Sequence, residues 1–312
     1  MRRHGRPPVG PAPAAATGPA PACVSPAVLL LVLGSAVIHA SWNLWIKQLG
    51  PGVRSAPLLW LLESISAVVY APFAWGVIAA TGWRPDASAL VLVLGSGFIH
   101  VGYFVLLLRG YRAADLSLVY PIARGTGPLL AAAGAVLLLG EQPTALSVTG
   151  TLLIAIGVLV VAGRPSGLTP GKLGPGVFYG LATGVSIAAY TLWDGWSVKR
   201  ALIPPLVFYW GGEATRVLLL TPVALGARRE IGELFRAQRW RVLGIALLSP
   251  LSYILILLAL RTGDVGHIAP AREVSILIGA WLGGRVLGEG DRTRRLIAAA
   301  AFAAGVIALA LD

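Results

Sequence analysis

The sequence predicts an all-α membrane protein with ten transmembrane helices. Three observations lead to this prediction: the mean hydropathy is +0.78, 56% of the residues are hydrophobic and only 12% are charged, and long apolar runs alternate with short polar connectors. A soluble domain carries about 25% charged residues, so the composition argues against a soluble enzyme, a nucleic-acid-binding module and a disordered protein. The formal net charge of +12 fits a membrane protein whose basic residues lie in the connectors.

Each expected helix is an apolar run long enough to cross a bilayer, which takes roughly 20 residues. The runs are continuously apolar rather than alternating, which favours helices over a membrane β-barrel. The expected spans, in chain order, are 27–46, 56–80, 88–108, 115–139, 144–163, 173–194, 203–226, 242–260, 265–288 and 296–311. The last run is short, but Arg294 and Arg295 at its start can extend their charged groups to the membrane surface.

Helix-stopping or charged residues separate these runs. They include Gly50-Pro51-Gly52, Arg84-Pro85-Asp86, Arg164-Pro165, Pro204-Pro205 and Asp291-Arg292. The connector at 228–241 carries five arginines, which suits a surface segment that meets anionic lipid headgroups.

Residues 1–26 differ from the rest of the chain. Arg2, Arg3 and Arg6 precede a stretch of Pro, Ala and Gly that lacks the apolar segment a signal peptide needs. We therefore expect a disordered, basic tail. Cys23 is the one cysteine, so no internal disulfide can form, and the residues before it favour an unmodified thiol.

Two motifs recur in the fourth span of each half of the chain. Arg, Asp and Pro have the same separations in Arg112, Asp115 and Pro121 as in Arg261, Asp264 and Pro270. Both spans then end in Leu-Gly-Glu, at residues 139–141 and 287–289. The chain therefore divides into two repeats of five spans, 27–163 and 173–311. An odd number of spans places the second copy upside down in the membrane, which is the inverted-repeat plan of many secondary transporters.

The motifs together resemble those of EamA-type carriers, which belong to the drug/metabolite transporter superfamily. They are His39-Ala40-Ser41-Trp42-Asn43 with Lys47, the run Asp115-Leu116-Ser117-Leu118-Val119-Tyr120-Pro121, and the paired Leu-Gly-Glu ends. The resemblance covers nearly the whole chain after residue 26. It implies ten helices in two EamA repeats, a central substrate cavity and transport of small metabolites without ATP hydrolysis, but it does not fix the substrate. The second half departs from the pattern, with Tyr190-Thr191-Leu192-Trp193-Asp194 in place of the His-Ala-Ser-Trp-Asn motif.

Six charged residues lie well inside the expected spans, where a charge costs about 2.5–3.5 kcal/mol. They are Glu63, Arg124, Glu213, Arg216, Arg272 and Glu273. Since three are acidic and three are basic, we expect them to pair. Glu213 and Arg216 share a helix face and can pair within their helix. Arg272 and Glu273 are neighbours that point about 100° apart, so they should meet partners on different helices.

Arg124 lies between Pro121 and Pro128, and we expect these prolines to break the helix. A broken helix beside a charge suits a binding site at the membrane midplane. One interpretation is that Arg124 anchors an anionic group of the substrate. The alternative is that it neutralises a buried carboxylate such as Glu63 or Glu273, in which case Arg272 becomes the expected anchor.

Other polar residues in the spans complete the candidate site. His39, Trp42 and Asn43 share one helix face, and His100 and Tyr103 share another. A lone histidine in a membrane is, however, often only a hydrogen-bonded contact between helices. The expected substrate-binding residues are Arg124, Glu63, His39, Trp42, Asn43, His100, Tyr103, Tyr120, Asp194, Arg272 and Glu273.

No phosphate-binding loop, zinc motif or serine-hydrolase elbow is present in the sequence. We therefore expect a secondary transporter in the plasma membrane, with no cofactor, no metal and no enzymatic activity. An intramembrane enzyme and a non-transporting scaffold or sensor are the alternatives. The expected partners are a small-molecule substrate and the lipid bilayer, with a homodimer left open and nucleic acid excluded. The orientation stays open too, because the family resemblance and the positive-inside rule disagree.

Overall fold

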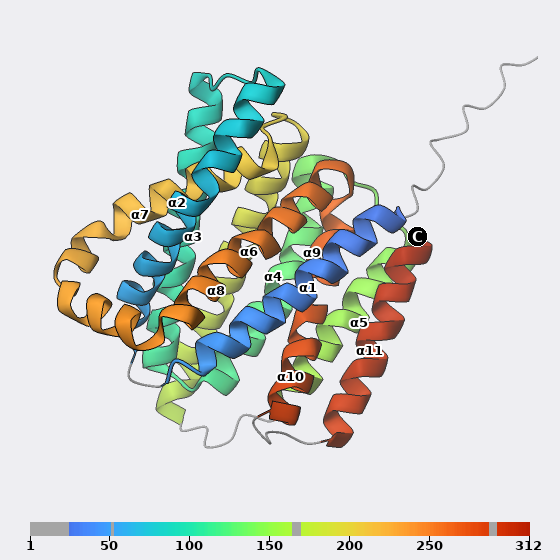
Figure 1. Ribbon diagram of the computed structural model, residues 1–312. Coiled ribbons are helices and arrows are strands. Elements are labelled where there is room, and N and C mark those ends of the chain that lie inside the picture. The colour runs from blue at the N-terminus through green and yellow to red at the C-terminus, as the bar shows by residue number, and fades with distance from the viewer. Residues whose placement is uncertain (1–24, 51–52, 164–169, 287–291) are drawn as a thin grey trace, which may run out of the picture.

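The computed structural model describes residues 25–50, 53–163, 170–286 and 292–312, which form a helical bundle (Figure 1). In chain order the elements are α1 (Pro26–Lys47), α2 (Ser55–Thr81), α3 (Ala87–Ala113), α4 (Leu116–Gly134), the π-helical η1 (Ala135–Leu139), α5 (Ala145–Ala162), α6 (Pro170–Lys199), α7 (Pro205–Leu225), α8 (Arg228–Thr262), α9 (Val265–Ala271), α10 (Val274–Val286) and α11 (Arg292–Leu311). The expected tail, apart from its last two residues, and the second Leu-Gly-Glu motif lie outside the described residues.

Local sequence signals explain where several helices begin. The side chain of Ser25 accepts a hydrogen bond from the backbone of Val28, and Thr144 caps α5 in the same way. Asp86 caps α3, with a distance of 2.7 Å from the backbone nitrogen of Ala89 to its carboxylate. That hydrogen bond lowers the pKa of the exposed Asp86 carboxyl.

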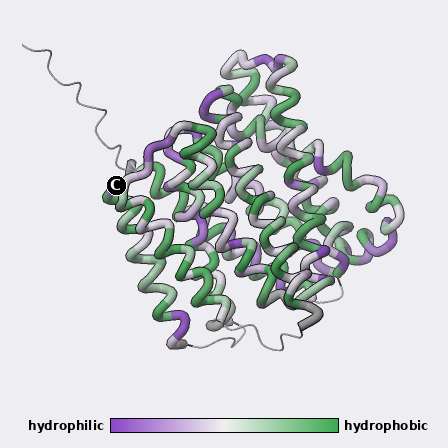
Figure 2. Tube along the Cα trace, turned by 180° about the vertical axis from the view of Figure 1, so that it is seen from behind, coloured by the Kyte–Doolittle hydropathy of each residue, from purple (hydrophilic) through white to green (hydrophobic). Residues whose placement is uncertain are grey.

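Eight of the described helices are long and apolar enough to cross a membrane, and the chain is a multi-pass integral membrane protein. Hydrophobic residues run along the helices, and many of the hydrophilic ones gather at their ends (Figure 2). The helices outside this set are α7, which carries Glu213 and Arg216, and the pair α9 and α10, with seven and 13 residues. A single span was expected over 265–288, but the described part of this segment is two short helices.

The expected helix break around Arg124 is wrong. The helix α4 continues from Leu116 to Gly134 through both Pro121 and Pro128. Each proline removes one N–H donor, while the hydrogen bonds on either side persist, and α4 packs closely along α6. A break lies instead later in the chain, where α9 ends at Ala271 and α10 begins at Val274.

The basic connector 228–241 is helical and continuous with the apolar helix that follows it. The helix α8 begins at Arg228, so it extends well before the expected span 242–260. A kink at Gln238, with φ −128° and ψ 24°, separates the basic segment from the apolar one. Charged side chains of this segment bond to near neighbours, as Arg229 does to Glu233 at 2.8 Å.

The halves of the chain pack against each other helix by helix. The closest pairs are α4 with α6, α5 with α11, α1 with α8, α2 with α7, and α3 with α6. Figure 1 shows α5 and α11 side by side at one edge of the bundle. Glycines allow this approach, since a Cβ added to Gly150 would lie 2.8 Å from the carbonyl oxygen of Gly305.

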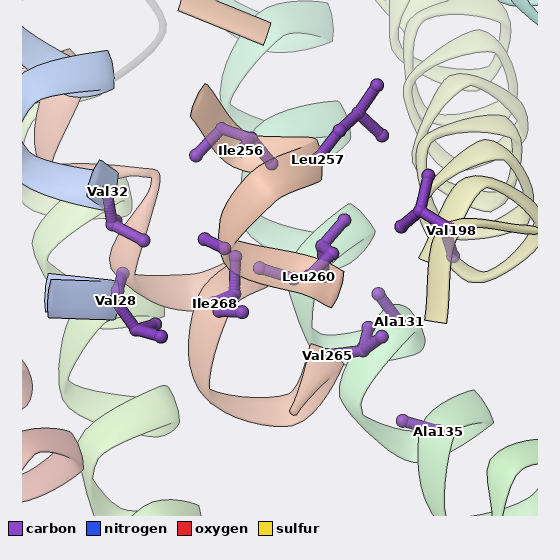
Figure 3. Packing of buried hydrophobic residues seen from close by; sticks show 14 of the residues in the cluster. Val28, Val32, Ala131, Ala135, Val198, Ile256, Leu257, Leu260, Val265 and Ile268 are labelled. Atoms are coloured by element: carbon purple, nitrogen blue, oxygen red, sulfur yellow. The ribbon is translucent and has the colours of Figure 1, made fainter. Parts of the chain in front are cut away.

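Part of the main hydrophobic core lies where α1, α8 and α9 meet. Val28 and Val32 of α1 point toward Ile268 of α9, and Leu260 of α8 lies beside them (Figure 3). All four side chains are buried. This part of the core brings α9 into contact with the first helix of the chain, while α9 packs more closely along α4 and α5.

Candidate functional site

A cavity of about 400 Å³ lies inside the bundle. Seven helices, α1 to α4 and α6 to α8, contribute to its wall, together with Arg272 at the break between α9 and α10. Its charged residues are Glu63, Arg124, Arg216 and Arg272. Its ring-bearing residues are His39, Trp42, His100, Tyr103, Phe104, Tyr111, Tyr120, Tyr190, Tyr209 and Tyr253.

The structure brings the expected site residues together at this cavity. All of them line it except Asp194 and Glu273. Those two are almost completely buried, and each contacts a residue of the wall. The expected site residues come from six different expected spans, so their convergence is a result of the tertiary structure.

Arg124 forms an ion pair with Glu273 across helices. The distance from Nε of Arg124 to Oε2 of Glu273 is 2.9 Å, and the exposed fractions of the side chains are 7% and 1%. This geometry supports the alternative in which Arg124 neutralises a buried carboxylate. It also confirms that Arg272 and Glu273 meet partners on different helices.

Arg272 lies at the broken helix and has no such counter-ion. Its Nη2 donates a hydrogen bond to the Tyr190 hydroxyl at 2.9 Å. Its guanidinium carbon lies 5.8 Å from the ring centroids of both Tyr190 and Tyr253, which is within the range of cation–π attraction. Among the described residues, no carboxylate lies within 4.0 Å of it.

Arg216 pairs with Glu63 of α2, so the expected pair of Arg216 with Glu213 inside α7 is wrong. Nε and Nη2 of Arg216 both donate to Oε2 of Glu63, at 3.0 and 2.8 Å. The reason is that α7 packs along α2, so the guanidinium can reach across and make two charge-assisted hydrogen bonds. Glu213 is fully buried, and within the described part of the chain its carboxylate oxygens accept no hydrogen bond.

Asp194 lies directly behind the cavity wall. The hydroxyl of Tyr253 donates to its Oδ2 at 2.6 Å, and Nε2 of His100 lies 3.9 Å from the same oxygen. His100 stacks on Tyr190 at a centroid distance of 4.4 Å. Because Nδ1 of His100 is 2.9 Å from the carbonyl oxygen of Ser96, Nδ1 carries the proton in this arrangement. The other ring nitrogen of His100, Nε2, faces the carboxylate of Asp194.

The helix face of α1 that carries the first motif forms another part of the wall. The rings of His39 and Trp42 meet edge to face at 4.8 Å. The indole of Trp42 donates to the hydroxyl of Ser252 on α8, at 3.4 Å. Asn43 donates to the carbonyl oxygen of His39 on its own helix, at 2.7 Å. Trp42 thus connects two helices, whereas the described contact of Asn43 is local.

Sequence reasoning did not select several residues of the wall as binding residues. Tyr209, Tyr253 and Arg216 are the main examples, and Tyr190 entered only as part of a motif. The available signal was a tyrosine in the middle of an apolar span, because its hydroxyl needs a hydrogen-bond partner there. Tyr253 and Tyr190 meet that requirement with Asp194 and Arg272.

The first Leu-Gly-Glu motif has a contact outside the cavity. Gly140 adopts a left-handed conformation, with φ +71°, and ends the helical segment. Glu141 then accepts hydrogen bonds from the backbone nitrogens of Val265 and Gly266, at 2.8 and 2.9 Å. The motif therefore joins the end of η1 to the start of α9.

Comparisons with known proteins agree with this architecture. No curated protein matches the chain. Among 29 matching chains of known structure, one titled only "Crystal structure of protein" has a TM-score of 0.73 and 18% sequence identity, covering 90% of this chain and 95% of its own. At that identity the likeness shows the fold alone. The model of the EamA-like transporter family matches residues 26–163. This matched segment contains the His39–Asn43 and Asp115–Pro121 motifs on which the resemblance was based.

Proposed function

We propose that this protein is a secondary transporter that moves a small metabolite across the plasma membrane by alternating access around the central cavity. The observation that carries the proposal is the cavity itself. A space of about 400 Å³, lined by arginines, tyrosines and histidines, lies inside a bundle of membrane helices. Intramembrane charges are costly and mark substrate pathways more often than structural positions.

The proposal includes ten spans in two inverted repeats, 27–163 and 173–311. The helix pairing supports it. If each helix of the first half corresponds to the helix five spans later, α1 corresponds to α6 and α3 corresponds to α8. The contact of α1 with α8 is then equivalent to the contact of α6 with α3. By the same rule α2 with α7 and α5 with α11 are equivalent helices in contact. A two-fold axis in the membrane plane generates this pattern.

The broken span supports a binding role for this site. Discontinuous membrane helices place helix ends, and the side chains at those ends, beside a substrate. Here the break lies at Arg272 and Glu273, next to a wall of the cavity. We propose that Arg272 binds the substrate and that His39, Trp42, Tyr103 and Tyr120 shape its pocket.

An intramembrane enzyme is the second candidate, and the observation that favours it is the contact of Asp194 with Tyr253 beside His100. The groups in that contact are nevertheless bound to one another, and only His100 and Tyr253 reach the cavity. A scaffold or sensor would not require the charged cavity. We therefore place the transporter first.

Transport can be tested with purified protein in liposomes loaded with a defined mixture of metabolites. The expected result is that at least one solute crosses the membrane chemically unchanged, faster than in protein-free liposomes. Ser249→Trp should block this flux, because Ser249 lines the cavity and the indole would fill it. Gly102→Trp is the matched control, since it adds the same side chain at an exposed position with no atom within 4 Å of the added Cβ.

Two results would contradict the proposal. One is a solute that is chemically converted by the protein, which would indicate an enzyme. The other is flux that Ser249→Trp leaves unchanged in a folded protein, which would place the pathway elsewhere.

A further inference from the structure

The charges at the cavity do not balance locally. Arg124 is paired with Glu273 at 2.9 Å, and Arg216 is paired with Glu63 at 2.8 Å. Arg272 is the charged residue of the wall that lacks a counter-ion within 4.0 Å among the described residues. One positive charge therefore remains at the cavity surface.

This surplus charge cannot be removed by titration, because the guanidinium of arginine keeps its proton in proteins. Among the described residues, the groups in direct contact with this guanidinium are a hydroxyl dipole and ring faces. Tyr190 accepts one hydrogen bond, and the rings of Tyr190 and Tyr253 lie 5.8 Å from the guanidinium carbon. A buried charge of this kind needs a partner, and an anion in the cavity can supply it.

The geometry of Arg272 also leaves room for a ligand. A guanidinium carries five N–H donors. The one hydrogen bond that it donates to a described residue goes to Tyr190, from Nη2. The remaining donors can form two parallel hydrogen bonds to the oxygens of a carboxylate, which is the arrangement that favours arginine over lysine.

We infer that the cavity binds an organic monoanion whose carboxylate pairs with Arg272 and whose apolar body lies among the aromatic rings of the wall. A phosphate monoester carries about 1.5 to 2 negative charges at pH 7, which exceeds the one charge that Arg272 leaves uncompensated. The rings that would contact the body are those of Trp42, Tyr103, Tyr120, Tyr190, Tyr209 and Tyr253. The inference rests on the proposed function, because it assigns a substrate class to the same cavity.

Asp194 is the competing source of compensation. Its carboxylate accepts a hydrogen bond from Tyr253, and the ring of Tyr253 lies beside Arg272. It does not reach the guanidinium itself. If Asp194 nevertheless supplied the counter-charge, pairing with Arg272 would add little to the affinity of an anion. The test therefore includes a variant of Asp194.

The test is calorimetric titration of purified protein with benzoate, with benzamide as a neutral probe of the same shape and with acetate as an anion without a ring. We expect benzoate to bind about tenfold or more tightly than benzamide, because hydrogen bonds to charged groups are worth at least that factor. Benzoate should also bind more tightly than acetate. Arg272→Gln should abolish the preference for benzoate over benzamide, and Arg272→Lys should retain only part of it.

Arg109→Gln is the matched control, because it removes the same charge from an exposed position outside the cavity wall. It should keep the preference for benzoate. Asp194→Asn should keep it as well. A large gain in benzoate affinity in Asp194→Asn would show that Asp194 already compensates Arg272, and this would overturn the inference. Equal affinity for benzoate and benzamide in the wild type, or an unchanged preference in Arg272→Gln with an unchanged melting temperature, would overturn it too.

The liposome experiment separates this inference from the proposed function. Metabolite flux without any preference for the anion would refute the substrate class and leave the transporter in place. Binding of benzoate that depends on Arg272, with no flux of any solute, would support the anion site and refute transport.

Discussion

Two buried ionic clusters differ in the sign of their unpaired member. Between α2 and α7, Arg216 is paired with Glu63, and Glu213 is left over as an extra acid. Between α4 and the α9–α10 break, Arg124 is paired with Glu273, and Arg272 is left over as an extra base. In each pair a guanidinium nitrogen lies less than 3 Å from a carboxylate oxygen, and the clusters differ most clearly in which charge lacks a counter-ion.

The difference shows how a membrane protein can tolerate an unmatched ionisable group. A buried carboxyl group can take up a proton and become neutral, so Glu213 can stay fully enclosed without a partner. An arginine has no such option. The extra arginine accordingly lies on the cavity wall, among tyrosines, whereas the extra glutamate does not line the cavity.

The largest expected effect comes from breaking the pair in the basic cluster. Arg124→Gln would leave Glu273 buried without its partner, which costs about 3–5 kcal/mol of folding stability. Thermal unfolding of the purified protein measures this loss. The double variant Arg124→Gln with Glu273→Gln should regain most of the stability. A single variant that melts like the wild type would show that the ion pair is not structural.

Breaking the pair in the acidic cluster should cost less. Glu63→Gln removes the partner of Arg216, but Glu213 lies three residues earlier on the same helix and can take over. We expect a loss of about 1.5–3 kcal/mol, the value of a hydrogen bond to a charged group. The double variant Glu63→Gln with Glu213→Gln removes both carboxylates and should unfold at a lower temperature than either single variant. If its loss of stability equalled only the sum of the two single losses, Glu213 would not replace Glu63 as the partner of Arg216.

The extra arginine should matter for binding and little for stability. Arg272→Gln leaves no carboxylate of the described chain without its partner and removes an uncompensated charge, so the free energy of unfolding should change by about 1 kcal/mol or less. The same thermal unfolding measurement checks this. A loss as large as that of Arg124→Gln would mean that Arg272 is a structural residue, and the two clusters would then be alike.

The smallest effect is expected at the extra acid. Glu213→Gln replaces a carboxyl group with an amide of nearly the same shape, and a protonated acid loses little by this exchange. We expect a change of about 0.5 kcal/mol or less, as for substitutions that disturb no partner. A strong destabilisation would show that Glu213 is ionised and balances a positive charge, which would break the contrast between the clusters.

The sequence alone determined the elements and the chemistry of the site. Helix positions follow from runs of apolar residues, which are a local property, so the expected spans coincide with helices except at 265–288, whose described part is the two short helices α9 and α10. The cost of a charge in lipid is likewise a property of one position. Polar residues inside the spans could therefore be selected from the sequence, whereas their convergence at one cavity is a result of the tertiary structure. Local helix geometry also predicted that the neighbouring side chains of Arg272 and Glu273 point in different directions and contact different helices.

Only the tertiary structure decided which charges pair, because partners on different helices are set by packing. Arg216 reaches Glu63 on another helix although Glu213 is nearer in the sequence. Arg124 pairs with Glu273 rather than with Glu63, and this leaves Arg272 without a counter-ion among the described residues. The tertiary structure also decided where the helix break lies. The two prolines of α4 predicted a break there, but α4 packs along α6 and is continuous. Composition fixes what each helix carries, and the contacts between helices determine which groups remain for a substrate.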